Sequence, residues 1–251
     1  MPDPRAIAPG PSPWPQDTGR LILDSTDSTN ADGLRRARAG LPQPFWIMAR
    51  AQTAARGRRG RHWASPLGNF AATRVSAAPE PVTAALYGFV AGLALVDALI
   101  ALGVDGPRLA LKWPNDVLYD GGKLAGILLE GDGTHLAIGI GVNLVSMPAA
   151  DDLEATARPP AHLGGAVTAD ALLDRLAWAM DAREAQFLTS GFEGIRAAWL
   201  ARAAGLGGQI TARLADRAIT GRFETIDGSG ALVLDTGAGC QQITAADIHF
   251  G

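Results

Sequence analysis

Lysine is rare in this chain and is confined to one segment. The sequence has twenty arginines but only two lysines, Lys112 and Lys123, and both fall between residues 112 and 126. An ammonium group is a compact charge that can sit between several anionic oxygens, whereas a planar guanidinium cannot enter the same space. We therefore interpret residues 112–126 as the chemical centre. The alternative is that two surface lysines lie close together by chance.

A second segment combines arginines with glycines directly after an apolar run. Gln52 is followed within nine residues by Arg56, Gly57, Arg58, Arg59, Gly60 and Arg61. Guanidinium groups match phosphate and carboxylate oxygens, and glycines let backbone N–H groups approach an anion. The segment is predicted to bind a polyphosphate. A basic patch for RNA or DNA, or a solvated loop, is the alternative, although only Trp63 could stack on a base.

Standard nucleotide-binding and hydrolase motifs are absent from the sequence. Gly122-Lys123 is followed by leucine where a P-loop needs Ser or Thr, and Gly139-Ile-Gly141 lacks the third glycine of a dinucleotide fingerprint. No G-x-S-x-G nucleophile motif occurs either. The two glycines still leave bare backbone on which a flat ligand could lie, and Asn143 offers a donor and an acceptor. Close packing of strands is the alternative reason for these glycines.

The composition limits the class of protein. With 251 residues, 47% of them hydrophobic, the chain can form one large core and a small appended domain. The net charge of −3 argues against an extended nucleic-acid-binding surface. A single cysteine, Cys240, excludes a disulfide framework. Neither a structural zinc nor another protein-bound metal is expected, because metal-ligand spacing is missing among His62, His135, His162 and His249.

Two features bear on the cellular compartment. The first fifteen residues hold six prolines and no apolar stretch of the signal-peptide kind, so a cytoplasmic protein is expected. Residues 82–103 are long and apolar enough for a membrane helix and contain a Gly88-x-x-x-Gly92 spacing. Asp97 would cost about 3 kcal/mol near a bilayer centre, and basic flanks are missing. We predict a helix buried against a sheet, with no membrane partner.

The pattern of apolar residues and turns predicts a mixed order of elements. Ser28 or Thr29 and Thr168 are predicted to cap helices, and Gly40 to end the first one. The turn Asp120-Gly-Gly122 is predicted to join two strands in an antiparallel hairpin. Residues 147–165 are predicted to form a mobile surface loop. Helices are expected at 29–39, 82–103, 168–188 and 192–203, and strands at 21–23, 45–52, 69–75, 109–113, 117–119, 123–130 and 135–144.

The pattern of apolar and turn residues changes after Gly205. Short alternating runs separated by turn residues predict strands at 209–213, 219–226, 231–234, 240–243 and 247–250, which is typical of a small barrel. We expect a disordered or extended proline-rich N-terminus at 1–20, a catalytic domain at 21–204 and a small β-domain at 205–251.

Five motifs, taken in this order, resemble the biotin protein ligases (biotin–[acetyl-CoA-carboxylase] ligases) over residues 21–250. They are Ser28-Thr-Asn30, Gln52-Thr53 with the Arg56–Arg61 segment, Lys112-Trp-Pro-Asn-Asp116, Lys123-Leu-Ala-Gly-Ile127 and Gly139-Ile-Gly-Val-Asn143. The resemblance implies an α+β fold with a mixed, largely antiparallel sheet flanked by helices, similar to class II aminoacyl-tRNA synthetases. It also implies a C-terminal SH3-like β-barrel.

The resemblance implies a two-step reaction. Biotin and ATP, with Mg²⁺, form biotinyl-5′-adenylate and pyrophosphate, and a lysine of a biotin carboxyl carrier protein domain then takes the biotinyl group. The implied biotin-binding residues are Ser28, Thr29, Asn30, Gln52, Arg56, Gly57, Arg58, Lys123, Gly126, Gly139 and Gly141. The implied ATP-binding residues are Arg56, Arg58, Arg61, Lys112, Asn115, Asp116, Lys123 and Asn143.

Individual roles follow from the same resemblance. Lys123 is predicted to be catalytic by touching both the biotin carboxylate and the α-phosphate. Arg58, the second predicted catalytic residue, closes over the adenylate with its neighbours. Asn115 and Asn143 are candidates for contacts with adenine, and Asp116 for orienting a lysine or Mg²⁺.

Two departures from the family pattern matter. Many members have glycine where this chain has Ala55; a positive φ there would cost alanine about 1 kcal/mol, which we expect to be tolerated. Some members carry an N-terminal helix-turn-helix repressor domain, which residues 1–20 are too short and proline-rich to form, so specific DNA binding is not expected. A lipoate ligase and an arginine-loop nucleic-acid-binding protein are the competing interpretations. Both a monomer and a homodimer are compatible with the sequence.

Overall fold

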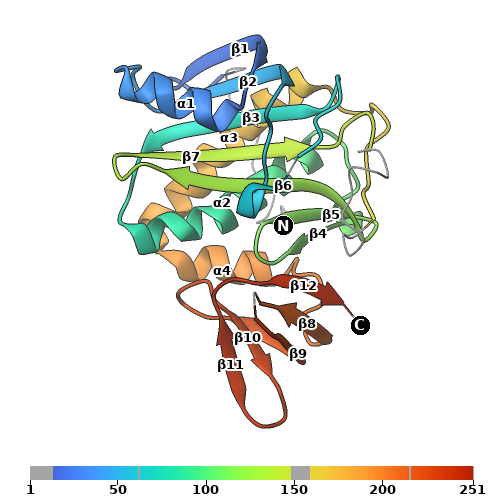
Figure 1. Ribbon diagram of the computed structural model, residues 1–251. Helices are drawn as coiled ribbons and strands as arrows, with labels where there is room; N and C mark the ends of the chain where they lie inside the picture. The colour runs from blue at the N-terminus through green and yellow to red at the C-terminus, as the bar shows by residue number, and fades with distance from the viewer. Residues whose placement is uncertain (1–13, 62, 148–158, 215, 251) are drawn as a thin grey trace, which may run out of the picture.

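The computed structural model of the chain describes residues 14–61, 63–147, 159–214 and 216–250. Figure 1 shows a sheet covered by helices and, beneath it, a smaller module formed by the C-terminal strands. The helices are α1 Thr29–Arg38, α2 Pro81–Ala101, α3 Ala169–Ser190 and α4 Phe192–Leu200, with short 3-10 turns η1 Arg58–Gly60 and η2 Gly106–Arg108. The strands are β1 Gly19–Thr26, β2 Phe45–Gln52, β3 Phe70–Ala77, β4 Leu109–Lys112, β5 Asp116–Tyr119, β6 Gly122–Gly131, β7 His135–Val142, β8 Gln209–Arg213, β9 Ala218–Ile226, β10 Leu232–Asp235, β11 Cys240–Ile243 and β12 Asp247–Phe250.

The larger sheet has seven strands in the order β1-β2-β3-β7-β6-β5-β4. Strands β1 and β2 are parallel, and every other neighbouring pair is antiparallel. The predicted hairpin between β5 and β6 is confirmed, and its turn places Asp120 and Gly121 at φ values of 49° and 75°. Two consecutive left-handed residues are what the tightest hairpin turns require. The predicted mixed, largely antiparallel sheet is therefore confirmed.

The two faces of this sheet pack against different helices. Along β2, Phe45 and Ile47 join a small cluster with Leu34 of α1, whereas Trp46 and Met48 join the main core with α2 and α3. This alternation follows from the period of two in a strand. Figure 1 accordingly shows α1 on one side of the sheet and α2 and α3 on the other.

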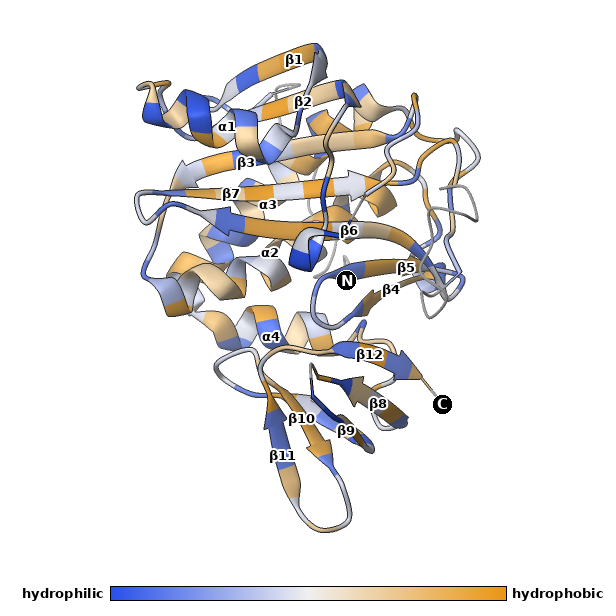
Figure 2. Cartoon of the chain, in the orientation of Figure 1, coloured by the Kyte–Doolittle hydropathy of each residue, from blue (hydrophilic) through white to orange (hydrophobic). Residues whose placement is uncertain are grey.

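Helix α2 is the apolar segment whose length would suit a membrane. By length and composition it could cross one, but most of its apolar window is buried inside the protein. Gly92 permits a close approach to the sheet, since a Cβ there would lie 3.3 Å from a Leu111 methyl group. Asp97 is 8% exposed and accepts a 2.6 Å hydrogen bond from Arg183 of α3. The predicted helix buried against a sheet is confirmed, and Figure 2 shows apolar residues running through both α2 and the central strands.

The C-terminal module is a five-stranded antiparallel sheet in the order β11-β10-β9-β8-β12. All five predicted strands are confirmed, three of them with the predicted bounds. Within the described residues β11 and β12 lie at the two edges of this sheet and do not pair with each other. The module meets the larger sheet through Trp113, whose Nε1 donates to the Gly230 carbonyl at 3.0 Å.

Some local predictions need correction. Strand β1 extends from Gly19 to Thr26 rather than over 21–23, because its parallel pairing with β2 recruits residues that show no apolar pattern. Ser28 is the N-cap residue of α1, but its side chain makes no cap hydrogen bond, whereas the predicted Thr168 cap accepts from the Ala171 N–H. The predicted proline-rich N-terminus and the predicted mobile loop fall largely on residues 1–13 and 148–158, which lie outside the described residues.

Candidate active site

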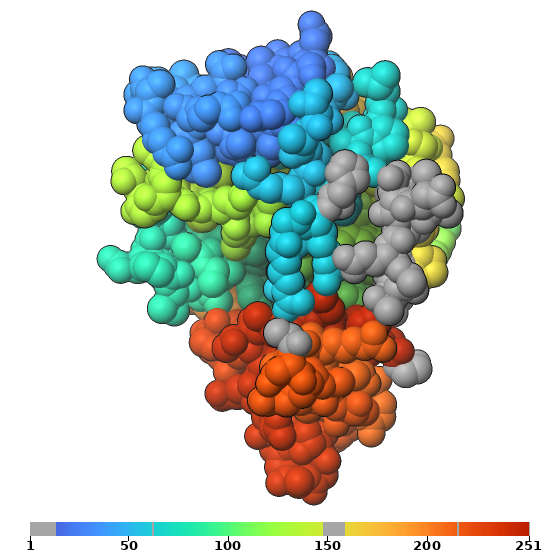
Figure 3. Space-filling view, viewed as in Figure 1, coloured from blue at the N-terminus to red at the C-terminus, as the bar shows by residue number. Residues whose placement is uncertain are grey.

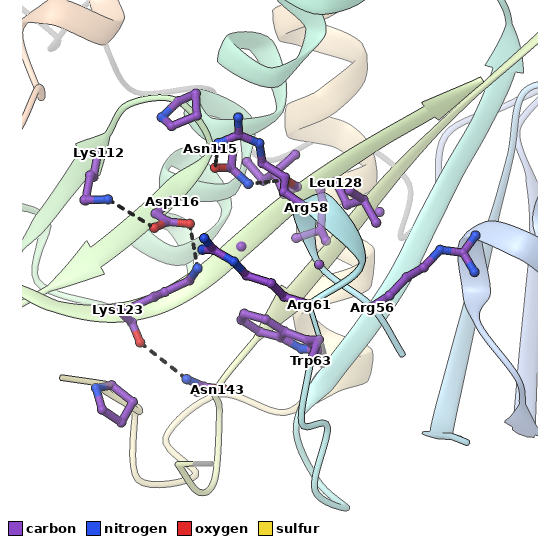
Figure 4. A pocket seen from close by; sticks show the side chains of 18 of the residues that line it. Arg56, Arg58, Arg61, Trp63, Lys112, Asn115, Asp116, Lys123, Leu128 and Asn143 are labelled. Carbon is purple, nitrogen blue, oxygen red and sulfur yellow. Dashed lines mark hydrogen bonds and ion pairs between the residues drawn. The ribbon is translucent and has the colours of Figure 1, made fainter. Parts of the chain in front are cut away.

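A cavity of about 730 Å³ opens between β6 and β7, the loop of residues 53–68 and the C-terminal module. Its lining contains every residue that the sequence analysis placed at the biotin or the ATP site. These residues come from segments up to 115 positions apart, from Ser28 to Asn143. The structure therefore brings the predicted set together, and the role of each member stays a prediction. Figure 4 shows the part of the cavity that holds most of the charged side chains.

One end of the cavity is lined by neutral hydrogen-bonding side chains, which the Glu130 carboxylate helps to hold. The Gln52 Oε1 accepts from the Thr29 N–H at 2.8 Å and from the Thr29 hydroxyl at 3.1 Å. The Asn30 Oδ1 accepts from the Thr73 hydroxyl at 2.6 Å, and its Nδ2 donates to Glu130 Oε2 at 2.8 Å. Thr29, Asn30 and Thr73 are at most 4% exposed. Buried side chains held in this way present fixed donors and acceptors to an uncharged polar ligand.

Gly126 of β6 and Gly139 and Gly141 of β7 line the cavity, and close contacts require glycine at the two positions in β7. A Cβ on Gly139 would lie 2.2 Å from Asn30 Oδ1, and one on Gly141 would lie 2.6 Å from the Trp63 indole nitrogen. The same indole lies over Gly126. Glycine at 139 therefore admits the buried asparagine, and glycine at 126 and 141 admits the Trp63 ring.

The other end of the cavity is cationic. Asp116 lies between the two lysines, with one carboxylate oxygen 2.8 Å from Lys123 Nζ and the other 3.7 Å from Lys112 Nζ (Figure 4). The backbone of Lys123 is fixed as well, because its N–H donates to the Pro159 carbonyl and its carbonyl accepts from the Ala161 N–H. Both ammonium groups are thus held in place beside a single carboxylate. Such an arrangement suits an anion that carries several oxygens.

Arg58 enters this end of the cavity from the loop of residues 53–68, which we call the arginine loop. Its Nη1 donates to the Asn115 Oδ1 at 3.3 Å, and the Asn115 Nδ2 donates to the Ile127 carbonyl at 2.6 Å. Burial lowers the pKa of the Arg58 guanidinium, the charges of Arg59 and Arg61 lower it further, and the charge of Asp247 opposes them. A partly desolvated guanidinium binds an anionic ligand more strongly than a solvated one.

Asn143 is buried next to the backbone of Lys123, with 2% of its surface exposed. Its Nδ2 donates to the backbone carbonyls of Lys123 and Ala161 at 3.3 and 3.1 Å. Among the described residues its Oδ1 has no hydrogen-bond partner. Asn143 therefore braces the start of β6 with its amide NH₂ and leaves an acceptor for a ligand that carries a donor.

Two predicted anion-binding arginines are paired with carboxylates in this structure. The Arg56 Nε donates to Glu130 Oε1 at 3.0 Å, and the Arg61 Nη2 donates to Asp247 Oδ2 at 2.6 Å. Figure 4 shows Arg56 pointing to the opposite side of the loop from Arg58. A phosphate would have to compete with these two carboxylates.

The sequence analysis missed four residues of this site. Thr73 and Glu130 hold Asn30, Trp63 covers the glycines, and Asp247 pairs with the arginine loop. Trp63, two positions after the arginine segment, was considered only as a residue that could stack on a base. The other three carry no local signal, because they occupy ordinary strand positions. Ala55 is not among the residues with positive φ, so the strain considered for an alanine there does not arise in this structure, and its tolerance stays a prediction.

Comparison with known proteins shows that this chain shares its fold with a class of ligases. The family described as "Biotin/lipoate A/B protein ligase family" matches residues 19–143, and the "Biotin protein ligase C terminal domain" matches residues 205–251. The chain belongs to the biotin/lipoate protein ligase family. The membership and the fold class predicted from the motifs are confirmed.

Individual relatives are more specific. The chain is 50% identical to the biotin–[acetyl-CoA-carboxylase] ligase of Paracoccus denitrificans, over 92% of this chain and all of the relative. It is 33% identical to the ligase of the same description from Mycobacterium tuberculosis, over 90% of this chain and 87% of the relative. The biotin protein ligase of Aquifex aeolicus in complex with biotin and ATP shares the fold, with a TM-score of 0.80 and 22% identity over 93% of this chain and 99% of that chain.

Proposed function

We propose that this protein is a biotin protein ligase that activates biotin with ATP and transfers the biotinyl group to a lysine of a carrier protein. The observation that carries the proposal is that the two ends of one continuous cavity differ in charge. Its buried end offers neutral donors and acceptors, suited to a ureido ring, and its open end offers Lys112, Lys123 and Arg58, suited to a carboxylate and a triphosphate. The 50% identity to a ligase of that description over nearly the whole chain supports it.

In the first step a carboxylate oxygen of biotin attacks the α-phosphorus of ATP. A bond forms between that oxygen and phosphorus, the bond from the α-phosphorus to the bridging oxygen breaks, and pyrophosphate leaves with the bond's electron pair. No proton has to move, so the main barrier is the repulsion between two anions. We assign its reduction to Lys123, placed to contact both anions, and to Lys112 and Arg58 beside it.

In the second step the uncharged amine of an acceptor lysine attacks the carbonyl carbon of biotinyl-adenylate. An amide forms, AMP leaves, and the amine loses a proton. Because the acceptor amine is itself the nucleophile, no covalent enzyme intermediate is needed. We propose a biotin carboxyl carrier domain of a carboxylase as the acceptor and the cytoplasm as the compartment.

Mg²⁺ is proposed to enter with ATP. The cation typically takes one or two carboxylates together with phosphate oxygens. Asp116 is the carboxylate that lines the cavity beside both lysines, and Mg²⁺ would have to share it with their ammonium groups. In the part of the chain that the structure describes, no group of three His, Cys, Asp or Glu side chains could hold a metal by itself. Bound Mg²⁺ would neutralise phosphate charge, and Asp116 would orient it.

We also propose that the chain divides near Gly205 into a catalytic domain and a C-terminal domain. The match of the C-terminal family to residues 205–251 supports this division, and so does the start of a separate sheet at Gln209.

The proposal is tested by ATP–pyrophosphate exchange on purified protein. Exchange that requires biotin, and that lipoate does not support, is the expected result. Exchange with lipoate but not biotin would identify a lipoate ligase instead. A salt-dependent shift of nucleic acid by protein that shows no exchange with either acid would indicate the nucleic-acid-binding alternative.

A further inference from the structure

The arginine loop meets the C-terminal module at one carboxylate. Asp247, the first residue of β12, accepts hydrogen bonds through Oδ2 from Arg59 Nη1 at 3.1 Å and from Arg61 Nη2 at 2.6 Å. Figure 3 shows this loop running down one face of the molecule until it reaches the C-terminal module. The contact joins residues nearly 190 positions apart, and Asp247 itself lines the cavity.

The two arginines bound by Asp247 follow Arg58 in the same turn. Arg59 adopts φ 57° and ψ 26°, a left-handed conformation that costs a residue other than glycine about 1 kcal/mol. The Gly57 N–H donates to the Arg61 carbonyl at 2.7 Å and closes the turn. In this turn Arg59 and Arg61 reach the C-terminal module while Arg58 reaches Asn115 in the cavity. The hydrogen bonds to Asp247 help to offset the cost of the strained residue.

The charges support the same arrangement. Arg58, Arg59 and Arg61 lie within four positions of one another, and like charges at this spacing repel. Burial raises the pKa of Asp247. The hydrogen bond from Arg61 and the charges of Arg61, Arg59 and Arg58 lower it by more, so the pKa lies below its usual value. The carboxylate is therefore ionised at neutral pH and offsets part of the repulsion inside the loop.

We infer that Asp247 is a positioning residue of the ligase reaction: it holds Arg59 and Arg61 so that Arg58 faces the adenylate. This inference rests on the proposed ligase function. It differs from a docking role, in which the same ion pairs would only fasten the module to the larger sheet. It also differs from a competing role, in which Asp247 would occupy the place of a phosphate and weaken ATP binding.

The test compares Asp247→Asn with a conservative and a control variant. Asn keeps the shape and removes the charge, and Asp247→Glu retains a carboxylate. Asp235→Asn is the control, since Asp235 lies in the same sheet, 3.6 Å from Arg222. We expect Asp247→Asn to raise the KM for ATP about tenfold, equivalent to about 1.4 kcal/mol, with kcat of biotin-dependent exchange changed less than about threefold. Asp247→Glu should recover most of the affinity, and Asp235→Asn should match the wild type.

A second readout does not depend on activity. Trypsin cuts after arginine, and the loop is an arginine-rich surface segment, so its cleavage reports how often the loop leaves its place. We expect Asp247→Asn to increase cleavage after Arg58, Arg59 and Arg61 about tenfold, and Asp235→Asn to leave it unchanged.

Three results would overturn the inference. An Asp247→Asn enzyme that melts earlier but keeps its KM for ATP and its loop cleavage would show docking alone. A lower KM for ATP would show that Asp247 competes with phosphate. Loop cleavage equal to that of the wild type would show that Asp247 does not hold the loop. If wild-type protein shows no biotin-dependent exchange, the proposed function fails instead, and the cleavage experiment separates the two failures.

Discussion

At the scale of single residues, Lys123 is fixed from both ends. Its ammonium lies 2.8 Å from Asp116 and 5.4 Å from the centre of the Trp63 ring, and its backbone is bonded to the 159–161 segment. We expect Lys123→Ala to slow adenylate formation by about 10², the scale for losing one preorganised electrostatic contact. Lys123→Arg should not restore the rate, because a planar fork cannot replace a point charge between two anions. Single-turnover adenylate formation measures this, and a wild-type rate in Lys123→Arg would refute the assigned role.

Gly139 offers a second test at this scale, directed at the buried end of the cavity. An alanine Cβ would lie 2.2 Å from Asn30 Oδ1, so the asparagine would have to move out of its network with Thr73 and Glu130. We expect Gly139→Ala to lower kcat/KM for biotin by about 10², because a displacement of about 1 Å in a positioned group costs that much. Gly228→Ala is the matched control, since nothing lies within 4 Å of its Cβ position. Equal kcat/KM for biotin in Gly139→Ala and wild type would contradict the packing argument.

At the scale of elements, the contact of α2, α3 and β3 contains buried charge. Arg74 of β3 is 3% exposed and donates through Nη1 to Glu184 of α3 at 3.2 Å, with a second bond between Nη2 and the other carboxylate oxygen. Tyr87 of α2 packs edge-on against Phe187 of α3 at 5.5 Å between ring centres. Burial, with the charge of Glu184 and a hydrogen bond to it, raises the pKa of Tyr87 from 10.0 to about 12. The Arg74–Glu184 pair therefore links α3 to β3 within this layer.

The Tyr87 shift predicts a specific alkaline instability. Between pH 10 and about 12 the unfolded chain has lost the phenol proton while the folded protein keeps it. The folded state then binds more protons, so the free energy of unfolding falls as the pH rises through this window, and below pH 10 the stabilisation is complete. Thermal melts from about pH 9 to pH 11.5 should show a smaller fall in Tm for Tyr87→Phe than for wild type. Parallel curves for the two proteins would show that Tyr87 does not titrate in this way.

At the scale of the whole molecule, the C-terminal module is held by residues next to the chemistry. Trp113 separates Lys112 from Pro114 in the chemical centre, is 3% exposed, and donates to the Gly230 carbonyl. Arg196 of α4 donates to the Ile226 carbonyl of the same module and to the Thr225 hydroxyl at 2.9 Å. The motif that carries Lys112, a predicted ATP-binding residue, therefore also docks the second sheet.

Removing this link should weaken the whole fold. Trp113→Phe keeps most of the apolar volume but leaves the Gly230 carbonyl without its donor, which costs about 1–3 kcal/mol for a buried group. We expect the free energy of unfolding to fall by that amount, measured by denaturant titration, while the KM for biotin stays close to wild type because Trp113 is not among the predicted biotin-binding residues. A variant as stable as the wild type would show that the hydrogen bond does not stabilise the docking.

The sequence by itself determined the local elements and identified many of the residues that line the cavity. Strand β2 and three C-terminal strands have the predicted bounds, and α1 and the β5–β6 turn lie where the cap and Asp-Gly signals placed them. These signals depend on neighbours within about five residues, so a short window carries them. The motifs named these residues because they supply charges, amides and hydroxyl groups, or are glycines that leave space for a ligand.

Only the tertiary structure decided how those residues are held. Nothing near Glu130 indicates that it contacts both Asn30 and Arg56, and nothing near Asp247 points to the arginine loop. The parallel pairing of β1 with β2 was likewise not predicted. Such contacts join segments up to nearly 190 positions apart, and their partners are selected by the packing of the whole core rather than by local preference. The sequence therefore specified the chemical groups of the site, and the fold determined which carboxylate positions each cation.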